Sequence, residues 1–402
     1  MVQNEDKKIS KNEDKLADDA KVTTRIASFD YIRTSVIILV LLHHAVLAYT
    51  TFAYINPANP IATISPVVDS QSWSGFDLIA LFNDTYFMSL LFFISGFFIW
   101  GSISRKGPQI FLRDRFIRLG IPFIIGFSLL IPLAYFPAQL QVELIYGGNT
   151  NYIDFWFGMV RSGFGTAGPL WFLWLLLTFN ILTVVLYRIT PHLGGNIISR
   201  VSTIFNRPFA FFGVLFGIST VAYLPLLLLF GFDHWTGIGP MVFQTSRILL
   251  YLVYFLMGTA IGVFGLSRTM FNSKSKFVRH GWVWIIASFG SFIVVIIFLV
   301  NPAGLIFYGT ALTFTCAAAV FGFIAIFLRF TKQPIGIIDS LSNNSYGIYI
   351  IHYVIVIWLQ FWLLEIQLPA ILKASIVFLG TLILSWSLIA AIRRIPVVAR
   401  VI

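Results

Sequence analysis

The sequence predicts an all-α polytopic membrane protein with about ten transmembrane helices. Its composition is 58% hydrophobic and 11% charged, and its mean hydropathy of +0.87 lies far outside the range of soluble proteins. Apolar runs long enough to span about 30 Å of hydrocarbon recur along the whole chain. They cover residues 34–51, 85–103, 119–137, 170–189, 209–230, 247–265, 281–300, 305–328, 343–364 and 370–392.

The positive charges predict the orientation of these helices. When alternate connections are assigned to one side, beginning with the N-terminal segment, 24 of the 27 Lys and Arg residues fall on that side. Only Arg161, Arg247 and Lys373 fall on the other side. By the positive-inside rule both termini are cytoplasmic, in a plasma or inner membrane. The net charge of +11 is therefore explained by the bilayer, and we expect no nucleic-acid partner.

The ends and the cysteine content limit the remaining possibilities. Residues 1–28 are polar, of mixed charge and without an apolar segment, which predicts a disordered cytoplasmic tail and not a signal peptide. Residues 29–402 are expected to form one transmembrane domain. The single cysteine, Cys316, excludes a disulfide and a cysteine-rich metal site. We expect no metal and no bound cofactor.

The first apolar helix carries Asp30, Arg33, His43 and His44. Ten residues separate Arg33 from His44, so their side chains point within about 20° of each other and lie about 16 Å apart along the axis. Ionisable residues inside a membrane helix are costly and are read as functional by default. A neutral His44 can accept a proton from a hydroxyl, which makes it the candidate general base. His43 points about 100° away and is expected to be structural.

Arginines gather at the cytoplasmic edge. Arg33 lies there, and Arg113, Arg115 and Arg118 precede the third apolar run; together these four residues are called the arginine rim. Guanidinium groups bind phosphate oxygens with two parallel hydrogen bonds, so the rim is a candidate clamp for a polyanionic cosubstrate. Anchoring to anionic lipid is the alternative. Asp30 is expected either to orient Arg33 or to cap the helix.

Further candidates line a predicted substrate cavity. If the ninth helix begins near Asn343, His352 lies about 13 Å into it, close to the depth of His44, and Tyr349 shares its face. Ser95 and Gly96 lie in the second helix, where small residues permit close helix packing. Trp171 opens the fourth helix, either as an interfacial anchor or as a platform for a sugar ring.

These residues resemble the motifs of the acyltransferase-3 family of membrane O-acyltransferases, and within it the branch of glucan biosynthesis protein C. The family pattern places an arginine and, after ten intervening residues, a histidine in the first span, matched by Arg33 and His44. It continues with a serine-glycine pair, two arginines spaced by two, a Trp-Phe-Leu element and a late Tyr-x-x-His. The matching residues here are Ser95 and Gly96, Arg115 and Arg118, Trp171 to Leu173, and Tyr349 and His352.

The resemblance implies transfer of an acetyl or succinyl group from cytoplasmic acyl-CoA to a hydroxyl of an extracytoplasmic glycan or glycolipid. Acyl-CoA would be a cosubstrate held by Arg113, Arg115 and Arg118, with His44, Arg33 and Asp30 in the catalytic site. Two other functions stay open: a glycan or glycolipid transporter or flippase whose histidines relay protons, and an export partner that performs no chemistry.

Overall fold

The computed structural model describes residues 27–189, 204, 206–265, 269–272, 275–299, 301, 304–331 and 335–402. Within these ranges ten helical spans are long and apolar enough to cross a bilayer, which confirms the predicted fold class. The predicted tail, residues 1–28, lies outside the described residues except for Ala27 and Ser28, which belong to the first helix.

The first span is the helix Ala27–Leu47. The second joins α2 (Ser74–Phe97) to α3 (Ile99–Lys106), and the third joins α4 (Pro108–Arg115), α5 (Ile121–Ile125) and α6 (Ile131–Tyr146). The remaining spans are α8 (Trp171–Ile189), α10 (Pro208–Phe230), α11 (Ile248–Phe264), α13 (Gly281–Leu299), α14 (Leu305–Phe330), α15 (Gly336–Trp362) and α16 (Ala370–Ile392). Shorter elements are α7 (Tyr152–Arg161), α12 (Lys276–Arg279), α17 (Pro396–Val401) and a hairpin of β1 (Trp235–Ile238) with β2 (Met241–Gln244).

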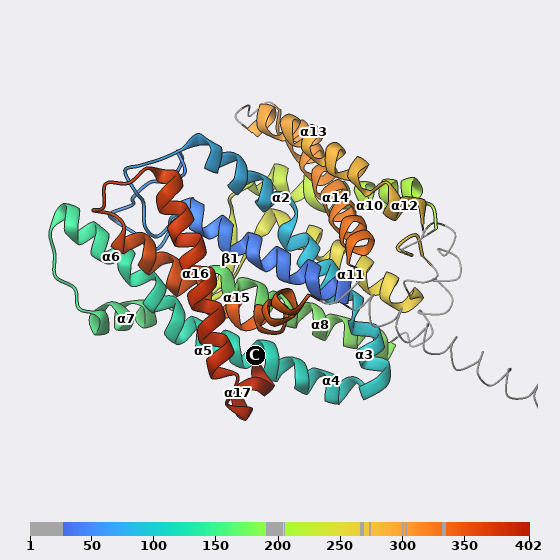
Figure 1. Cartoon of the computed structure of the whole chain (residues 1–402), viewed down its shortest axis with the longest axis horizontal. Helices are drawn as coiled ribbons and strands as arrows, with labels where there is room; N and C mark the ends of the chain where they lie inside the picture. The colour runs from blue at the N-terminus through green and yellow to red at the C-terminus, as the bar shows by residue number, and fades with distance from the viewer. Residues whose placement is uncertain are drawn as a thin grey trace, which may run out of the picture.

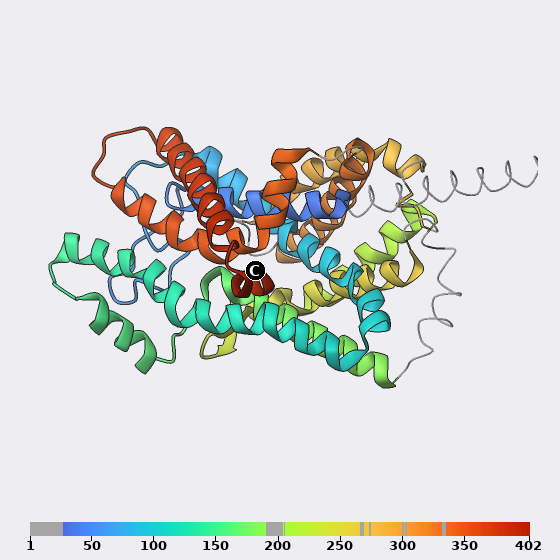
Figure 2. The ribbon, with the colours of Figure 1, turned by 60° about the horizontal axis from the view of Figure 1, so that its bottom comes forward.

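The first helix runs through the middle of the molecule (Figures 1 and 2). In the view of Figure 2 the red helix α16 lies on one side of it and the third span on the other. Tyr31 ties the beginning of this helix to α15, because its hydroxyl donates to Asp339 and accepts from the Ile335 amide. The first helix is therefore fixed by protein contacts near its beginning, although Asp30 and Arg33 remain 36% and 42% exposed.

The third span is longer than its apolar run suggests. The loop expected over 105–118 is helical, and only Gly107, with φ 77°, separates α3 from α4. Two π-helical segments, Phe116–Gly120 and Gly126–Leu130, interrupt the span. As a result Arg113 and Arg115 lie on α4 and Arg118 on the first π segment.

Prolines inside the third span free three backbone carbonyls, because proline has no N–H to donate to the residue four before it. Each freed carbonyl accepts a hydrogen bond from an aromatic side chain. Trp156 Nε1 donates to Ser128 (2.8 Å), Trp358 Nε1 donates to Leu133 (2.9 Å), and the Tyr346 hydroxyl donates to Arg118. These bonds attach α7 and α15 to the third span at fixed heights.

Glycines bring α2 and α11 into backbone contact. A Cβ on Gly258 would lie 2.0 Å from the Phe93 carbonyl oxygen, and one on Gly96 would lie 2.1 Å from that of Phe255. Gly262, four residues after Gly258, meets the Phe97 carbonyl in the same way. This is the close packing expected of small residues in membrane helices, and it confirms the interpretation of Gly96.

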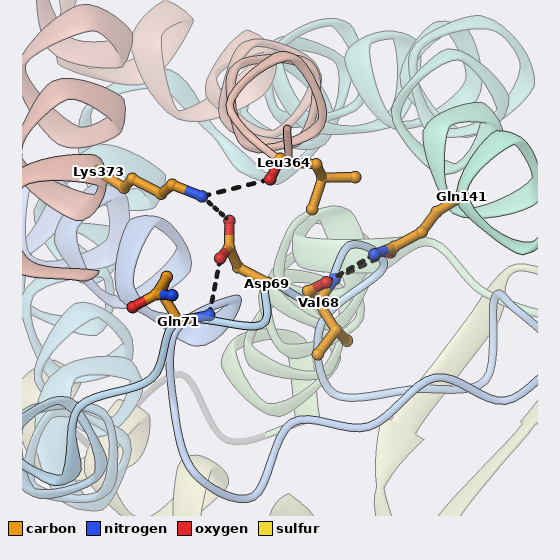
Figure 3. A network of polar contacts seen from close by, with 6 residues as sticks. All are labelled: Val68, Asp69, Gln71, Gln141, Leu364 and Lys373. Carbon is orange, nitrogen blue, oxygen red and sulfur yellow. Dashed lines mark hydrogen bonds and ion pairs between the residues drawn. The ribbon is translucent and has the colours of Figure 1, made fainter. Parts of the chain in front are cut away.

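The segment of residues 48–73, between the first helix and α2, is held in place by buried polar contacts (Figure 3). Lys373 Nζ on α16 lies 2.6 Å from Asp69 Oδ2, and both side chains are 1% exposed. Gln141 on α6 bonds both the amide and the carbonyl of Val68, at 3.0 and 2.6 Å. The segment is thus fixed to two helices that follow it much later in the chain.

Candidate active site

A cavity of about 570 Å³ lies beside the C-terminal half of the first helix. Its volume is within the range of small-molecule binding sites. The wall combines residues of several helices, the segment of residues 48–73 and the hairpin. It includes His43 and His44, Asp84 and Phe87 of α2, Tyr349 and Tyr353 of α15, Trp171, Tyr251, Asp233, Trp235 and Gln244.

His44 and His352 lie side by side next to this cavity. Their ring centroids are 5.4 Å apart, and the Tyr353 ring lies 5.0 Å from that of His44. His44 lines the cavity, whereas His352 is fully buried behind it. Helix α15 begins at Gly336 and not near Asn343, but the first helix also begins earlier than its apolar run. The distance of each histidine from the beginning of its helix therefore increases by a similar amount, and the two histidines stay at a similar depth.

The hydrogen bonds indicate which nitrogen of His352 carries the proton. His352 Nδ1 lies 2.6 Å from the Tyr349 carbonyl oxygen, which can only accept, so we assign the proton of the neutral ring to Nδ1. The Nε2 atom is buried and has no partner among the described residues. The same is true of His44 Nδ1. Unpaired buried nitrogens are unusual and need an explanation such as a catalytic role.

His43 also faces the cavity, which corrects the expectation that it is only structural. Its ring lies 5.3 Å from that of Phe87 and 5.3 Å from that of His44. The two histidines point in different directions, as their spacing requires. Both reach the same space because the cavity curves around the helix from α2 to α15.

An ion pair lies in the wall next to His43. Arg247 Nη2 lies 2.6 Å from Asp84 Oδ2, and Nη1 donates to the Asp84 carbonyl at 2.7 Å. The Arg247 side chain is 5% exposed and the Asp84 side chain is 41% exposed. The arginine is thus enclosed by protein, and the carboxylate is on the cavity side of the pair.

The arginine rim lies apart from the cavity. None of its four residues lines the cavity, and Arg33 is about 16 Å before His44 on the first helix. Arg33 Nη2 pairs with Asp30 Oδ1 at 3.0 Å. Since Ala27 is already helical, Asp30 lies inside the helix and is not its N-cap, so of the two expected roles the orienting one fits.

Helix α15 connects the rim to the cavity. The Tyr346 hydroxyl donates to the Arg118 carbonyl at the rim. Tyr349, three residues later and about 4.5 Å further along the axis, already lines the cavity. About one turn of α15 therefore separates the contact with the Arg118 backbone from the part of the helix that lines the cavity.

The sequence model of one protein family, described as an acyltransferase domain, matches residues 26–390. The chain belongs to the acyltransferase-3 family. No curated protein and no solved structure shows a significant match to the sequence. Family membership makes the protein a membrane enzyme of the O-acyltransferase type.

The aromatic wall of the acyltransferase cavity centres on Trp171, one of the residues predicted for it. Trp171 stacks on Tyr251 with ring centroids 5.5 Å apart, and Trp235 of β1 meets it edge-on at 6.1 Å. Trp174, on the next turn, donates its Nε1 proton to the Val242 carbonyl at 3.1 Å. The two tryptophans thereby attach the hairpin to α8.

Ser95 does not line the cavity, although the sequence placed it there. The part of α2 that reaches the cavity ends with Met88. Ser95 lies seven residues later, about 10 Å further along the helix and away from His44. Its neighbour Gly96 serves the contact with α11 instead.

Asp84, Asp233, Tyr251 and Tyr353 were not predicted for the site. Asp84 could have been recognised in the sequence, because an acidic residue inside a membrane helix indicates function. It lies inside such a helix because α2 begins at Ser74. The predicted run began one residue after it. Among the described residues no group of three or more His, Cys, Asp and Glu side chains lies close enough to hold a metal ion.

Proposed function

We propose that this acyltransferase moves an acyl group from cytoplasmic acyl-CoA to a hydroxyl of an extracytoplasmic glycan or glycolipid, with His44 as general base. The observation that carries the proposal is the position of His44. It borders a cavity of about 570 Å³, and the same helix carries Arg33 at its other end. The glucan biosynthesis protein C branch is the subfamily whose motifs the chain resembles.

The donor is proposed to bind across one turn of α15. The arginine rim would hold the phosphates of acyl-CoA, since planar guanidinium groups bind phosphate oxygens in pairs. The thioester would then extend past Tyr346 to Tyr349 and the cavity. The contact of Tyr346 with Arg118 supports this path, because it fixes the rim against the helix that borders the cavity.

In the proposed reaction, neutral His44 accepts the proton of the acceptor hydroxyl while the hydroxyl oxygen attacks the thioester carbonyl carbon. The carbon–sulfur bond breaks, and the CoA thiolate takes the proton back from His44. His352 acts as a positioning residue, since its ring packs against that of His44 and is itself held by the Tyr349 carbonyl. No covalent acyl-enzyme is required.

An acetyl group suits the cavity better than a succinyl group. A succinyl chain carries a second carboxylate that needs a cation. Arg247 and Arg161 are the candidates on the expected side of the membrane. Arg247 directs both terminal nitrogens at Asp84, and Arg161 is an exposed residue at the end of α7 that does not line the cavity.

His44→Ala tests the base. We expect acylation of cell-surface glycans, measured by mass spectrometry, to fall by about 10²–10⁴-fold at equal membrane abundance. His280→Ala is the matched control, because His280 is exposed and bonds only within its own helical turn in the described structure. Unchanged acylation in His44→Ala would overturn the assignment. Failure of the purified enzyme to consume acetyl-CoA and succinyl-CoA would overturn the donor and favour transport.

A further inference from the structure

The wall of the cavity contains two aspartates, and its described lining offers no guanidinium or ammonium group to an anion. Asp84 and Asp233 both line it, and in the part of the chain that the structure describes none of the lining residues is Lys or Arg. The nearest guanidinium, that of Arg247, is 5% exposed and has both terminal nitrogens within hydrogen-bond distance of Asp84. An anionic group that enters the cavity therefore meets carboxylates, and the one cation behind them is already engaged.

The two carboxylates line the same cavity from different elements of the fold. Asp84 lies on α2 near His43, whereas Asp233 lies in the connection between α10 and β1 and is exposed. Loss of part of the water around the Asp233 carboxyl, together with the negative field of Asp84, raises the pKa of Asp233 above its ordinary value. A carboxylate that entered the cavity would be repelled by Asp233 and would find no free cation at Asp84, whose partner Arg247 is already paired.

The remaining lining groups suit an uncharged sugar. Trp171, Trp235 and Tyr251 offer flat apolar faces for the C–H side of a pyranose ring. Asn59, Thr63 and Gln244 add neutral hydrogen-bonding groups. The Asp84 carboxylate, held by Arg247, can also accept a hydrogen bond from a sugar hydroxyl.

We propose that the acceptor sugar that reaches His44 is uncharged, and that Asp84 and Asp233 exclude sugars that carry a carboxylate. This selection follows from the charge of the wall, because specificity is a difference between two affinities and like charges lower the affinity for the anionic sugar. The inference rests on the proposed function, since it concerns the acceptor of the same reaction. It adds the chemical class of that acceptor, which the sequence leaves open.

The test compares two glycosides that differ in charge and by one methyl group, octyl β-glucuronide and its methyl ester, with octyl β-glucoside as a third acceptor. Purified enzyme receives acetyl-CoA and each glycoside alone, and mass spectrometry measures the acetylated product. Each glucuronide is also added as a competitor against octyl β-glucoside, so the comparison holds if the 6-hydroxyl is the one acetylated. We expect the methyl ester to be used, or to compete, at least about tenfold better than the acid.

Asp233→Asn tests the contribution of the Asp233 carboxylate to the exclusion of acidic sugars. We expect the variant to reduce severalfold the ratio between use of the ester and use of the acid, because it removes the charge and preserves the shape of the side chain. Asp154→Asn is the control, since Asp154 is exposed on α7 and does not line the cavity. An unchanged difference in Asp233→Asn would overturn the role of Asp233.

The outcomes separate this inference from the proposed function. Equal use of acid and ester, or preference for the acid, with acetyl-CoA still consumed, overturns the charge exclusion and leaves the donor chemistry intact. Consumption of acetyl-CoA without acetylation of any glycoside, and without competition by them, overturns the sugar site. If neither acetyl-CoA nor succinyl-CoA is consumed with any glycoside, the proposed function itself fails.

Discussion

The ion pair of the arginine rim and those around the cavity differ in burial and in the distance between their partners along the chain. Asp30 and Arg33 are three residues apart, and their side chains are 36% and 42% exposed. Asp69 and Lys373 are 304 residues apart and are each 1% exposed. Asp84 and Arg247, 163 residues apart, combine a buried arginine with a carboxylate that is 41% exposed. Exposed charges near each other in sequence are free to bind a ligand, whereas buried pairs between distant segments hold the cavity wall in place.

Removing one partner of the most buried pair should have the largest effect on stability. Lys373→Met leaves the Asp69 carboxylate buried without a cation, which costs about 3–5 kcal/mol. Thermal unfolding of the detergent-solubilised protein measures the loss. Asp69→Asn combined with Lys373→Met should recover most of it, because the buried charge is gone. A single variant as stable as the wild type would show that the pair does not fix the segment of residues 48–73.

Removing Asp84 and removing Arg247 should lower the free energy of unfolding by different amounts. Asp84→Asn leaves the enclosed Arg247 guanidinium without its counterion and should cost several kcal/mol, about as much as Lys373→Met. Arg247→Met leaves Asp84, which the cavity can hydrate, so its cost should be about 1–2 kcal/mol. Unfolding of both variants under one detergent condition measures the difference. Equal costs would contradict the unequal burial of the two side chains.

The exposed pair should matter least for stability. Asp30→Asn should change the free energy of unfolding by less than about 1 kcal/mol, as is usual for exposed ion pairs. In the proposed mechanism Arg33→Gln is equally mild for stability but raises KM for acyl-CoA, because it removes a phosphate-binding group. Steady-state kinetics with acyl-CoA varied and the acceptor saturating separates KM from kcat. A large loss of stability with unchanged KM would make the rim structural.

The ten spans could be predicted because hydrophobicity is a local property of each segment. Their ends could not, since helices continue past the apolar run through polar residues that hydrophobicity does not detect. Helix α2 begins at Ser74, eleven residues before its predicted run, and the third span begins at Pro108. The same extension converts the expected loop of residues 105–118 into helix and brings Asp84 inside a span.

The candidate site was predictable where one helix carries the signal. Arg33 and His44 follow from helical spacing, and the resemblance placed His352, Tyr349 and Trp171 with them. Pairs such as Asp84 with Arg247 join residues far apart in sequence, and no local pattern reveals them. His43 was misjudged because one helix was considered alone, without α2 opposite it. Ser95 was assigned to the cavity by its motif, although its position on α2 takes it to the α11 side.

The bond between Asp69 and Lys373 also sets an order on the biogenesis of the protein. Chains are made from the N-terminus, so Asp69 is synthesised 304 residues before its partner Lys373, which lies on the tenth of the described spans. Until α16 inserts, the Asp69 carboxylate has no cation and must stay hydrated. The wall of residues 48–73 is therefore completed only after α16 has been made, and a chain that lacks α16 has an incomplete cavity wall.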